Sequence, residues 1–160
     1  MIIADLHIHS KYSRATSRDC VPELLDLWAR RKGIGLVGTG DFTHPAWRSE
    51  LAEKLIPAGE GVYALREELR QTDGTALDSA RPRFVITGEI SSIYKKDGRV
   101  RKVHSLILLP SLAAAENLSR RSGCCRWPPA AGTGSPPPPG RAGGSGCAPC
   151  APGRPSCRWS

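Results

Sequence analysis

Hydrophobic and polar positions follow two different periods along the first three-quarters of the chain. Short apolar runs typical of strands occupy residues 1–8, 34–41, 83–94 and 100–109. Helical spacing of apolar residues, opened twice by a proline, occupies residues 21–33, 45–55, 60–72 and 110–121. Asp97-Gly98 lies between the last two strands and predicts a β-hairpin turn. Strands that alternate with helices predict an α/β fold with a largely parallel sheet. Trp28 and Trp47, on predicted helix faces, are expected in its core.

The pattern stops near residue 122. Residues 122–160 hold nine prolines and eight glycines, and they contain no Val, Ile, Leu, Phe or Met. Such a segment buries too little apolar surface to offset its chain entropy, so we expect a disordered tail. Its Gly, Pro, Arg, Ala, Cys and Trp are also typical of GC-rich DNA translated in the wrong frame. We therefore divide the chain into a folded part, 1–121, and a tail, 122–160, that we expect to be a frameshift product.

Charge adds only a little to this picture. The formal net charge is +8, and residues 1–121 contain all fifteen acidic residues. A basic chain is compatible with nucleic acid or another polyanion as partner. No apolar run approaches the roughly 18 residues that cross a membrane, and the N-terminal residues lack the basic start of a signal peptide. A cytoplasmic location is therefore expected.

The stretch ADLHIHSKYS, residues 4–13, carries the first candidate chemistry. Side chains at i and i+2 of a strand point to the same side, so His7 and His9 are expected to project together, as two imidazoles on one metal ion require. Asp5 would lie on the same side and could orient one of the histidines. The alternative is a pair of hydrogen-bonded histidines at a strand end.

Three further strands end in residues of metal-ligand type. VGTGDFTH places Asp41 at the end of the second strand, with His44 three residues on. Because the carboxyl ends of parallel strands form the active edge of α/β proteins, Asp41 is a site candidate, although Asp41 or Thr43 could instead cap the next helix. Glu89 ends an apolar strand, where its charge must be paired, hydrated or coordinated. His104 lies in the following strand, where the alternative is a hydrogen-bonded core histidine.

In this order and spacing, ADLHIHSKYS, GTGD, ITGEIS and VHSLIL resemble the polymerase and histidinol phosphatase (PHP) family of metal-dependent phosphoesterases. DLHIHSKYSRATS and LVGTGDFTHPAW are most similar to the PHP domain of the endonuclease Q branch, which cuts DNA beside deaminated bases. The resemblance covers roughly residues 2–118. It implies a distorted β/α barrel, of which this chain holds the first part, with up to three divalent ions at the carboxyl strand ends.

The resemblance also implies roles for individual residues. His7 and His9 would hold a first ion, Glu89 would bridge it to a second, and His104 would bind the second. Asp41 would belong to the third-ion group, although Phe42 stands where the family has a histidine, which makes His44 only a weak candidate. The ions would activate a water molecule and neutralise phosphate oxygens. Zinc suits the imidazoles, and manganese or iron suits a mixed set.

The family's late ligands, another histidine and an Asp-x-His pair, have no counterpart after His104. We therefore expect an incomplete barrel with an unpaired strand edge and exposed apolar surface. Candidate phosphate-binding residues lie in the loop after the first strand and in the hairpin: Arg14, Arg18, Lys95 and Lys96. The alternative for the hairpin is that its lysines only form a solvated strand edge and bind no phosphate. DNA is the expected partner of the full-length form. The alternatives are a small-molecule phosphatase of the histidinol-phosphatase type and an inactive truncated remnant.

Overall fold

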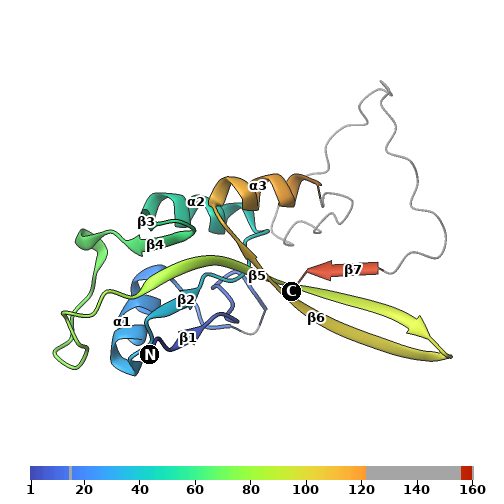
Figure 1. Cartoon of the computed structure of the whole chain (residues 1–160), viewed down its shortest axis with the longest axis horizontal. Helices are drawn as coiled ribbons and strands as arrows, with labels where there is room; N and C mark the ends of the chain where they lie inside the picture. Colours follow the sequence, from blue (N-terminus) through green and yellow to red (C-terminus); the bar gives the residue numbers. More distant parts are fainter. Residues whose placement is uncertain (15, 122–155, 160) are drawn as a thin grey trace, which may run out of the picture.

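The structure is a computed structural model of the whole chain, and it describes residues 1–14, 16–121 and 156–159. Helices and strands alternate along the chain (Figure 1). In chain order they are β1 (Ala4–Asp5), α1 (Pro22–Lys32), β2 (Leu36–Gly38), α2 (Pro45–Lys54), β3 (Leu55–Gly59), β4 (Val62–Leu65), the 3-10 helix η1 (Glu67–Leu69), β5 (Arg83–Lys96), β6 (Arg99–Leu109), α3 (Leu112–Arg121) and β7 (Ser156–Trp159).

The strands form one mixed sheet in the order β1-β2-β5-β4-β3, with β6 and β7 also paired to β5. β1 pairs with β2, and β2 with β5, in parallel, whereas the other pairs in the described part of the chain are antiparallel. The expected largely parallel sheet is therefore wrong. Two hairpins, β3–β4 and β5–β6, connect neighbouring strands directly, and such connections give antiparallel pairs. The described strands form this open sheet, and the distorted barrel stays a prediction.

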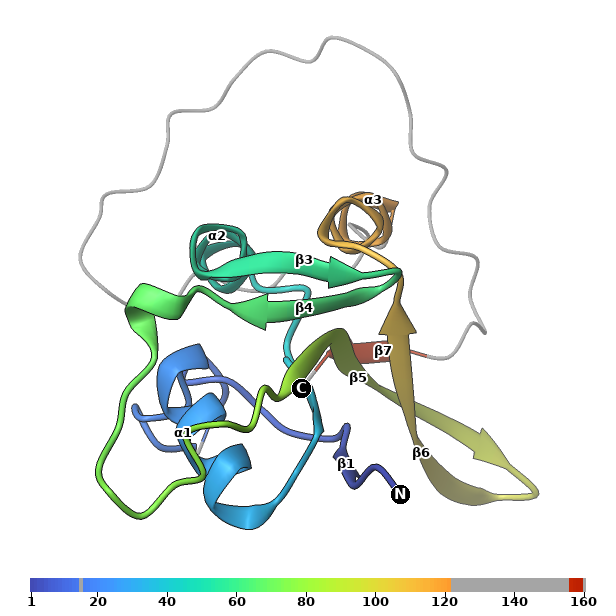
Figure 2. The ribbon, with the colours of Figure 1, turned by 60° about the vertical axis from the view of Figure 1, so that its left-hand side comes forward.

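Three of the four expected helices, α1, α2 and α3, form as the sequence predicts. Pro22 and Pro45 begin α1 and α2, where a residue without a backbone N–H costs the helix nothing. Gly33 ends α1 with φ at +70°, a left-handed conformation that glycine adopts without strain. α2 and α3 lie side by side in both views (Figures 1 and 2), and Arg48 of α2 donates to Ser119 of α3 at 3.2 Å.

The expected helix over residues 60–72 is wrong, because this segment forms β4 and then η1. Gly59 and Gly61 have positive φ angles of 150° and 70° and turn the chain back on itself between β3 and β4. The hairpin pairs Leu55 with Leu65, and both are buried. The glycines on both sides of Glu60 favour a turn. The apolar residues after this turn, although spaced as in a helix, therefore occupy positions of a short strand.

The core lies between the sheet and the helices. Trp47 is completely buried, and its indole Nε1 donates to the carbonyls of Thr39 and Gly40, at 3.1 Å each. The prediction that Trp28 lies in the core is wrong. The residue is 50% exposed, and its ring lies beneath the cationic groups of Arg31 and Lys32. A tryptophan can leave the core in this way because a cation over its face replaces part of the packing.

Residues 122–155 of the tail lie outside the described residues, so their expected disorder stays a prediction. Residues Ser156–Trp159 differ from that expectation, because they form β7 and pair with Ile90–Ile93 of β5. β2 pairs with β5 only as far as Val85, which leaves backbone groups further along this side of β5 open to another strand. Beyond β7, the β5–β6 hairpin extends away from the body of the molecule (Figures 1 and 2).

Candidate metal centre

Glu89 lies at the centre of the candidate site. Its side chain is only 5% exposed, and one carboxylate oxygen, Oε2, lies 2.7 Å from His7 Nε2 and 3.7 Å from His9 Nε2. One ligand atom from each of these three residues lies within 4.8 Å of the others, which makes them a group that could hold a metal ion. Residues from the first segment and from β5, 82 positions apart, thus meet at one point.

The other carboxylate oxygen of Glu89, Oε1, contacts Nδ1 of His104. β5 and β6 explain this arrangement. Ser91 is directly opposite His104 in the antiparallel register, and Glu89 is two residues before Ser91, so the three side chains share one face. Ser91 Oγ lies 3.5 Å from His104 Nε2. Glu89 therefore lies between imidazoles of the N-terminal segment on one oxygen and an imidazole of β6 on the other.

Asp41 contacts His9 at the ring nitrogen that faces away from Glu89. Its Oδ1 lies 3.0 Å from His9 Nδ1, while Oδ2 accepts hydrogen bonds from the backbone N–H and the hydroxyl of Ser10, both at 2.7 Å. A carboxylate in this position fixes the orientation and tautomer of the imidazole and leaves Nε2 available as a ligand. Sequence reasoning missed Ser10, although its place directly after His9 is a usable signal.

Glycines allow the end of β2 to approach the two histidines. Gly40 has φ at +66°, and a Cβ atom there would overlap the carbonyl oxygen of Ile8. The backbone N–H of Gly40 donates to Thr87 Oγ1 at 2.9 Å, which ties this turn to β5. Asp41 itself has φ at +45°, a conformation that aspartate tolerates better than most residues. The GTGD sequence thus places a carboxylate beside His9 because its glycines permit close backbone contact.

His44 lies outside this cluster and caps α2. Its Nδ1 accepts from the backbone N–H of Trp47 at 3.4 Å, and its ring stacks on Tyr12 with centroids 4.2 Å apart. Burial lowers the pKa of His44, against Asp41, which raises it, while Arg48 lowers it further. A neutral imidazole is the form that accepts this hydrogen bond. The alternative in which Asp41 or Thr43 caps this helix is therefore wrong, because His44 is the capping residue.

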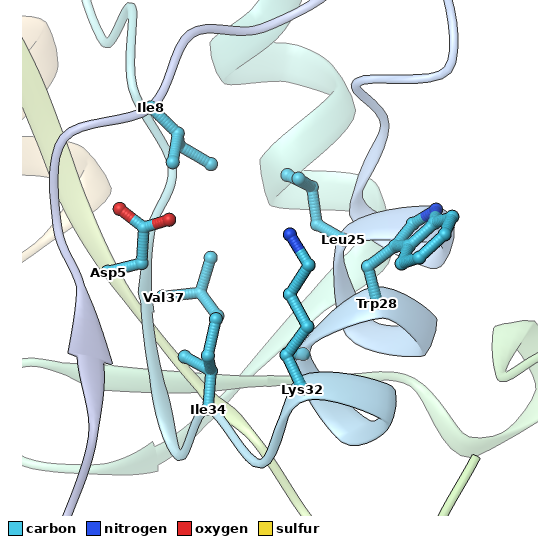
Figure 3. A pocket seen from close by; sticks show the side chains of 8 residues that line it. Asp5, Ile8, Leu25, Trp28, Lys32, Ile34 and Val37 are labelled. Carbon is cyan, nitrogen blue, oxygen red and sulfur yellow. The ribbon is translucent and has the colours of Figure 1, made fainter.

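Asp5 does not lie with the histidines, and the expected orienting role is wrong for it. Its side chain is exposed and faces a small pocket between β1, β2 and α1, lined also by Lys32 and Val37 (Figure 3). The strand spacing fails here because β1 ends at Asp5. Beyond that residue the chain no longer alternates as a strand, and contacts to Glu89 and Asp41 position His7 and His9.

The four candidate phosphate-binding residues occupy two separate places, and all of them are exposed. Arg14 and Arg18 lie in the loop that follows His9 and Ser10. Lys95 and Lys96 lie at the far end of β5, next to the hairpin turn. Lys11, in the same loop as Arg14, is held by Glu50 of α2 at 2.8 Å, which fixes the beginning of that loop. Arg14 and Arg18 follow His9 within one loop, whereas Lys95 and Lys96 follow Glu89 along β5.

The fold resembles that of a lesion-specific endonuclease. This endonuclease is endonuclease Q. Its structure from Pyrococcus furiosus is 29% identical to this chain and has a TM-score of 0.53, and the match covers 75% of this chain and 25% of the endonuclease chain. A second endonuclease Q structure, a complex with a 27-mer duplex that has an abasic lesion at the active site, is 30% identical with the same TM-score of 0.53. That match covers 76% of this chain and 26% of the other.

An uncharacterized protein of Methanocaldococcus jannaschii is 32% identical over 114 residues, which cover 71% of this chain and 10% of that protein. The chain thus spans about a tenth of this relative and about a quarter of the endonuclease Q chains. No family model matches the chain. Among the helices in the described part of the chain, none has the length and apolar character of a membrane span.

Proposed function

We propose that this chain carries the N-terminal part of the metal centre of a PHP-type phosphoesterase that acts on DNA in its full-length form. The observation that supports this best is Glu89, a nearly buried carboxylate with His7 and His9 at one oxygen and His104 at the other. A buried charge of this kind needs partners, and imidazoles together with a carboxylate suit zinc, manganese or iron.

The proposed roles follow from the contacts. His7 and His9 would hold one ion, His104 would hold a second, and Glu89 would be a ligand shared by both. Asp41 would orient His9 through Nδ1 and would belong to the ligands of a third ion. When bound, divalent ions supply a water-derived nucleophile near neutral pH and neutralise phosphate oxygens. Arg14 and Arg18 are exposed in the neighbouring loop, and their proposed role is to contact the phosphates of a substrate backbone.

The proposed substrate is duplex DNA that contains a deaminated base. Its support is the likeness to endonuclease Q at 29% and 30% identity, one structure of which is a complex with duplex DNA. The alternative within the same chemistry is a small phosphate ester. One assay distinguishes these two substrate classes. Duplexes with deoxyinosine or deoxyuridine, and a small aryl phosphate, are each incubated with the protein and manganese. Cleavage next to the altered base supports the proposal, and phosphate release alone supports the alternative.

Metal content tests the site independently of activity. The double variant His7→Ala/His9→Ala should lose most of the zinc or manganese that wild-type protein retains after dialysis, measured by elemental analysis. His44→Asn is the matched control, because it removes an imidazole outside the cluster while asparagine still caps a helix. Equal metal content in the wild type and the double variant would show that the site is assigned wrongly.

A further inference from the structure

We propose that the outer part of the β5–β6 hairpin, Tyr94–Val103, is an arm that binds the major groove of duplex DNA. The choice of DNA rests on the proposed function, whereas the arm itself follows from charge and shape. We call these ten residues the basic arm. The hairpin extends away from the helices and from the body of the sheet in both views (Figures 1 and 2).

The basic arm concentrates positive charge. It contains five cationic side chains and a single acidic one, Asp97, and all six are exposed. None of the five forms an ion pair with another residue in the described part of the chain, whereas cations on the body such as Lys11, Lys54 and Arg30 are held by carboxylates. The five are Lys95, Lys96, Arg99, Arg101 and Lys102.

The strand register divides these charges between the two faces of the ribbon. Lys96 is directly opposite Arg99, and Arg101 is opposite Tyr94, so three cations and an aromatic ring share one face. Lys95 and Lys102 lie on the other face, paired with Val100 and Ile93. Like charges directly opposite one another destabilise a strand pair. The Lys96–Arg99 pair therefore disfavours the free arm slightly, and a polyanion would relieve that repulsion.

The shape of the arm suits the groove. Asp97 and Gly98 both have positive φ, 53° and 72°, which gives a tight two-residue turn and a narrow end. Paired strands lie about 4.8 Å apart, and the major groove, about 12 Å wide, admits a two-stranded ribbon. Cations on both faces would meet the phosphates of both groove walls. Lysines that only protect a strand edge from aggregation need no such distribution, and they predict no specific effect on DNA binding.

The test measures binding of the full chain to a short labelled duplex by fluorescence anisotropy in EDTA, across a salt series. The arm variant is Lys96→Gln/Arg99→Gln/Arg101→Gln. The matched control, Lys32→Gln/Arg120→Gln/Arg121→Gln, removes the same charge from exposed helix ends. We expect the arm variant to bind about tenfold or more weakly, with a salt slope smaller by roughly 2 to 3, because each phosphate contact contributes about 0.9. The control should bind within about twofold of the wild type, since net charge alone acts weakly through salt.

A second variant, Lys95→Gln/Lys102→Gln, tests the other face and keeps the proposal testable should the triple variant unfold. It should lower the salt slope by roughly 1 to 2. Equal losses in the arm and control variants would overturn the proposal, as would failure of the wild type to bind duplex at low salt. Tighter wild-type binding to single-stranded DNA, RNA or anionic vesicles than to duplex would also overturn it.

The proposed function can fail separately from this inference. Binding in EDTA does not require the metal centre, so His7→Ala/His9→Ala should bind duplex as the wild type does. If that variant also retains its metal, the metal centre is wrong while the arm stands. If it loses metal and the arm variant binds duplex normally, the arm is wrong while the metal centre stands.

Discussion

Glu89 shows how one residue joins distant parts of the chain. Its carboxylate is almost completely buried, and its neighbours come from the N-terminal segment and from β6. Burying a charge costs several kcal/mol unless partners compensate, and three imidazoles around it do so. The groups that stabilise this buried carboxylate therefore all lie at the proposed metal centre.

Asp41 gives the first prediction at this scale. In Asp41→Asn, asparagine tolerates the positive φ of 45° but has a single acceptor oxygen, so it cannot serve both His9 and Ser10. We expect metal affinity to fall about 10- to 100-fold, as for other lost partners of a ligating histidine. A competition titration with a coloured chelator measures it. Asp5→Asn, in the pocket beside Lys32, should leave the affinity unchanged, and equal effects would contradict the role given to Asp41.

Glu50 predicts a pH dependence of stability. Burial tends to raise its pKa, but hydrogen bonds and charge from Lys11 and Lys54 outweigh this, so the pKa lies below the ordinary value of 4.5. A carboxyl with a lower pKa in the folded state adds stability above the ordinary value and loses it as pH falls through the lowered one. Glu50→Gln should therefore be less stable than the wild type near pH 7, by roughly 0.5 kcal/mol.

Thermal unfolding from pH 7 to pH 3 measures this difference. The gap between the wild type and Glu50→Gln should close as the solution becomes acidic, since the wild-type carboxyl then takes up a proton. Glu53→Gln, on the exposed side of α2, is the control and should follow the wild type throughout. A gap that stays constant down to pH 3 would show that the lysines do not stabilise the charged carboxylate.

The turn between β2 and α2 gives a prediction at the scale of elements. Gly40→Ala adds a Cβ that overlaps the carbonyl of Ile8 in a left-handed backbone conformation. The conformation alone costs about 1 to 2 kcal/mol, and the overlap adds to it, so we expect a larger loss in urea unfolding. Gly74→Ala is the matched control, with φ at +73° and nothing within 4 Å of its Cβ. Similar losses in both variants would mean that close contact at Gly40 is unimportant.

The elements that the sequence predicts correctly are those with local signals. Pro22 and Gly33 mark α1, Pro45 marks α2, and Asp97-Gly98 marks the β5–β6 turn. The apolar spacing of residues 60–72 predicts a helix wrongly, because over a short segment such spacing fits more than one kind of element. Their pairing with β3 depends on a partner strand that propensity does not reveal.

The site is partly predictable for the same reason. His104 and Glu89 share a face because β5 and β6 are regular and paired, and strand alternation anticipates this. Strand alternation predicts the wrong position for Asp5, because β1 is only two residues long. The cap at His44 and the contact of Asp41 with His9 depend on a turn whose path is set by close backbone approach at Gly40, and no periodicity encodes that path.

At the scale of the whole molecule, one face of β6 is open. Leu106 and Leu108 are 37% and 51% exposed, and both lie on the same face as His104. The neighbouring Leu109 faces the other way and packs against the buried core. This agrees with the expectation of exposed apolar surface, and such a surface on a short chain promotes self-association.

A pair of variants distinguishes the exposed face of β6 from the face that packs against the core. Leu108→Gln should reduce concentration-dependent association while thermal stability stays within about 0.5 kcal/mol of the wild type, as for exposed positions generally. Leu109→Gln should lower stability by about 2 kcal/mol or more, because it places an amide against the core. Sedimentation velocity measures the first effect and thermal unfolding the second. Association that persists unchanged in Leu108→Gln would show that this face does not cause it.

The length of β5 sets the distance between the proposed metal centre and the basic arm. Glu89 and Lys96 belong to one continuous strand, seven residues apart, which is roughly 23 Å at about 3.3 Å per residue. Under the proposed function, a duplex that lies along this strand would be held by the basic arm at a point roughly seven base pairs, at 3.4 Å each, from the proposed cleavage site. Adding or removing two residues on each side of the turn would then move the protected footprint relative to the nick, by about two base pairs.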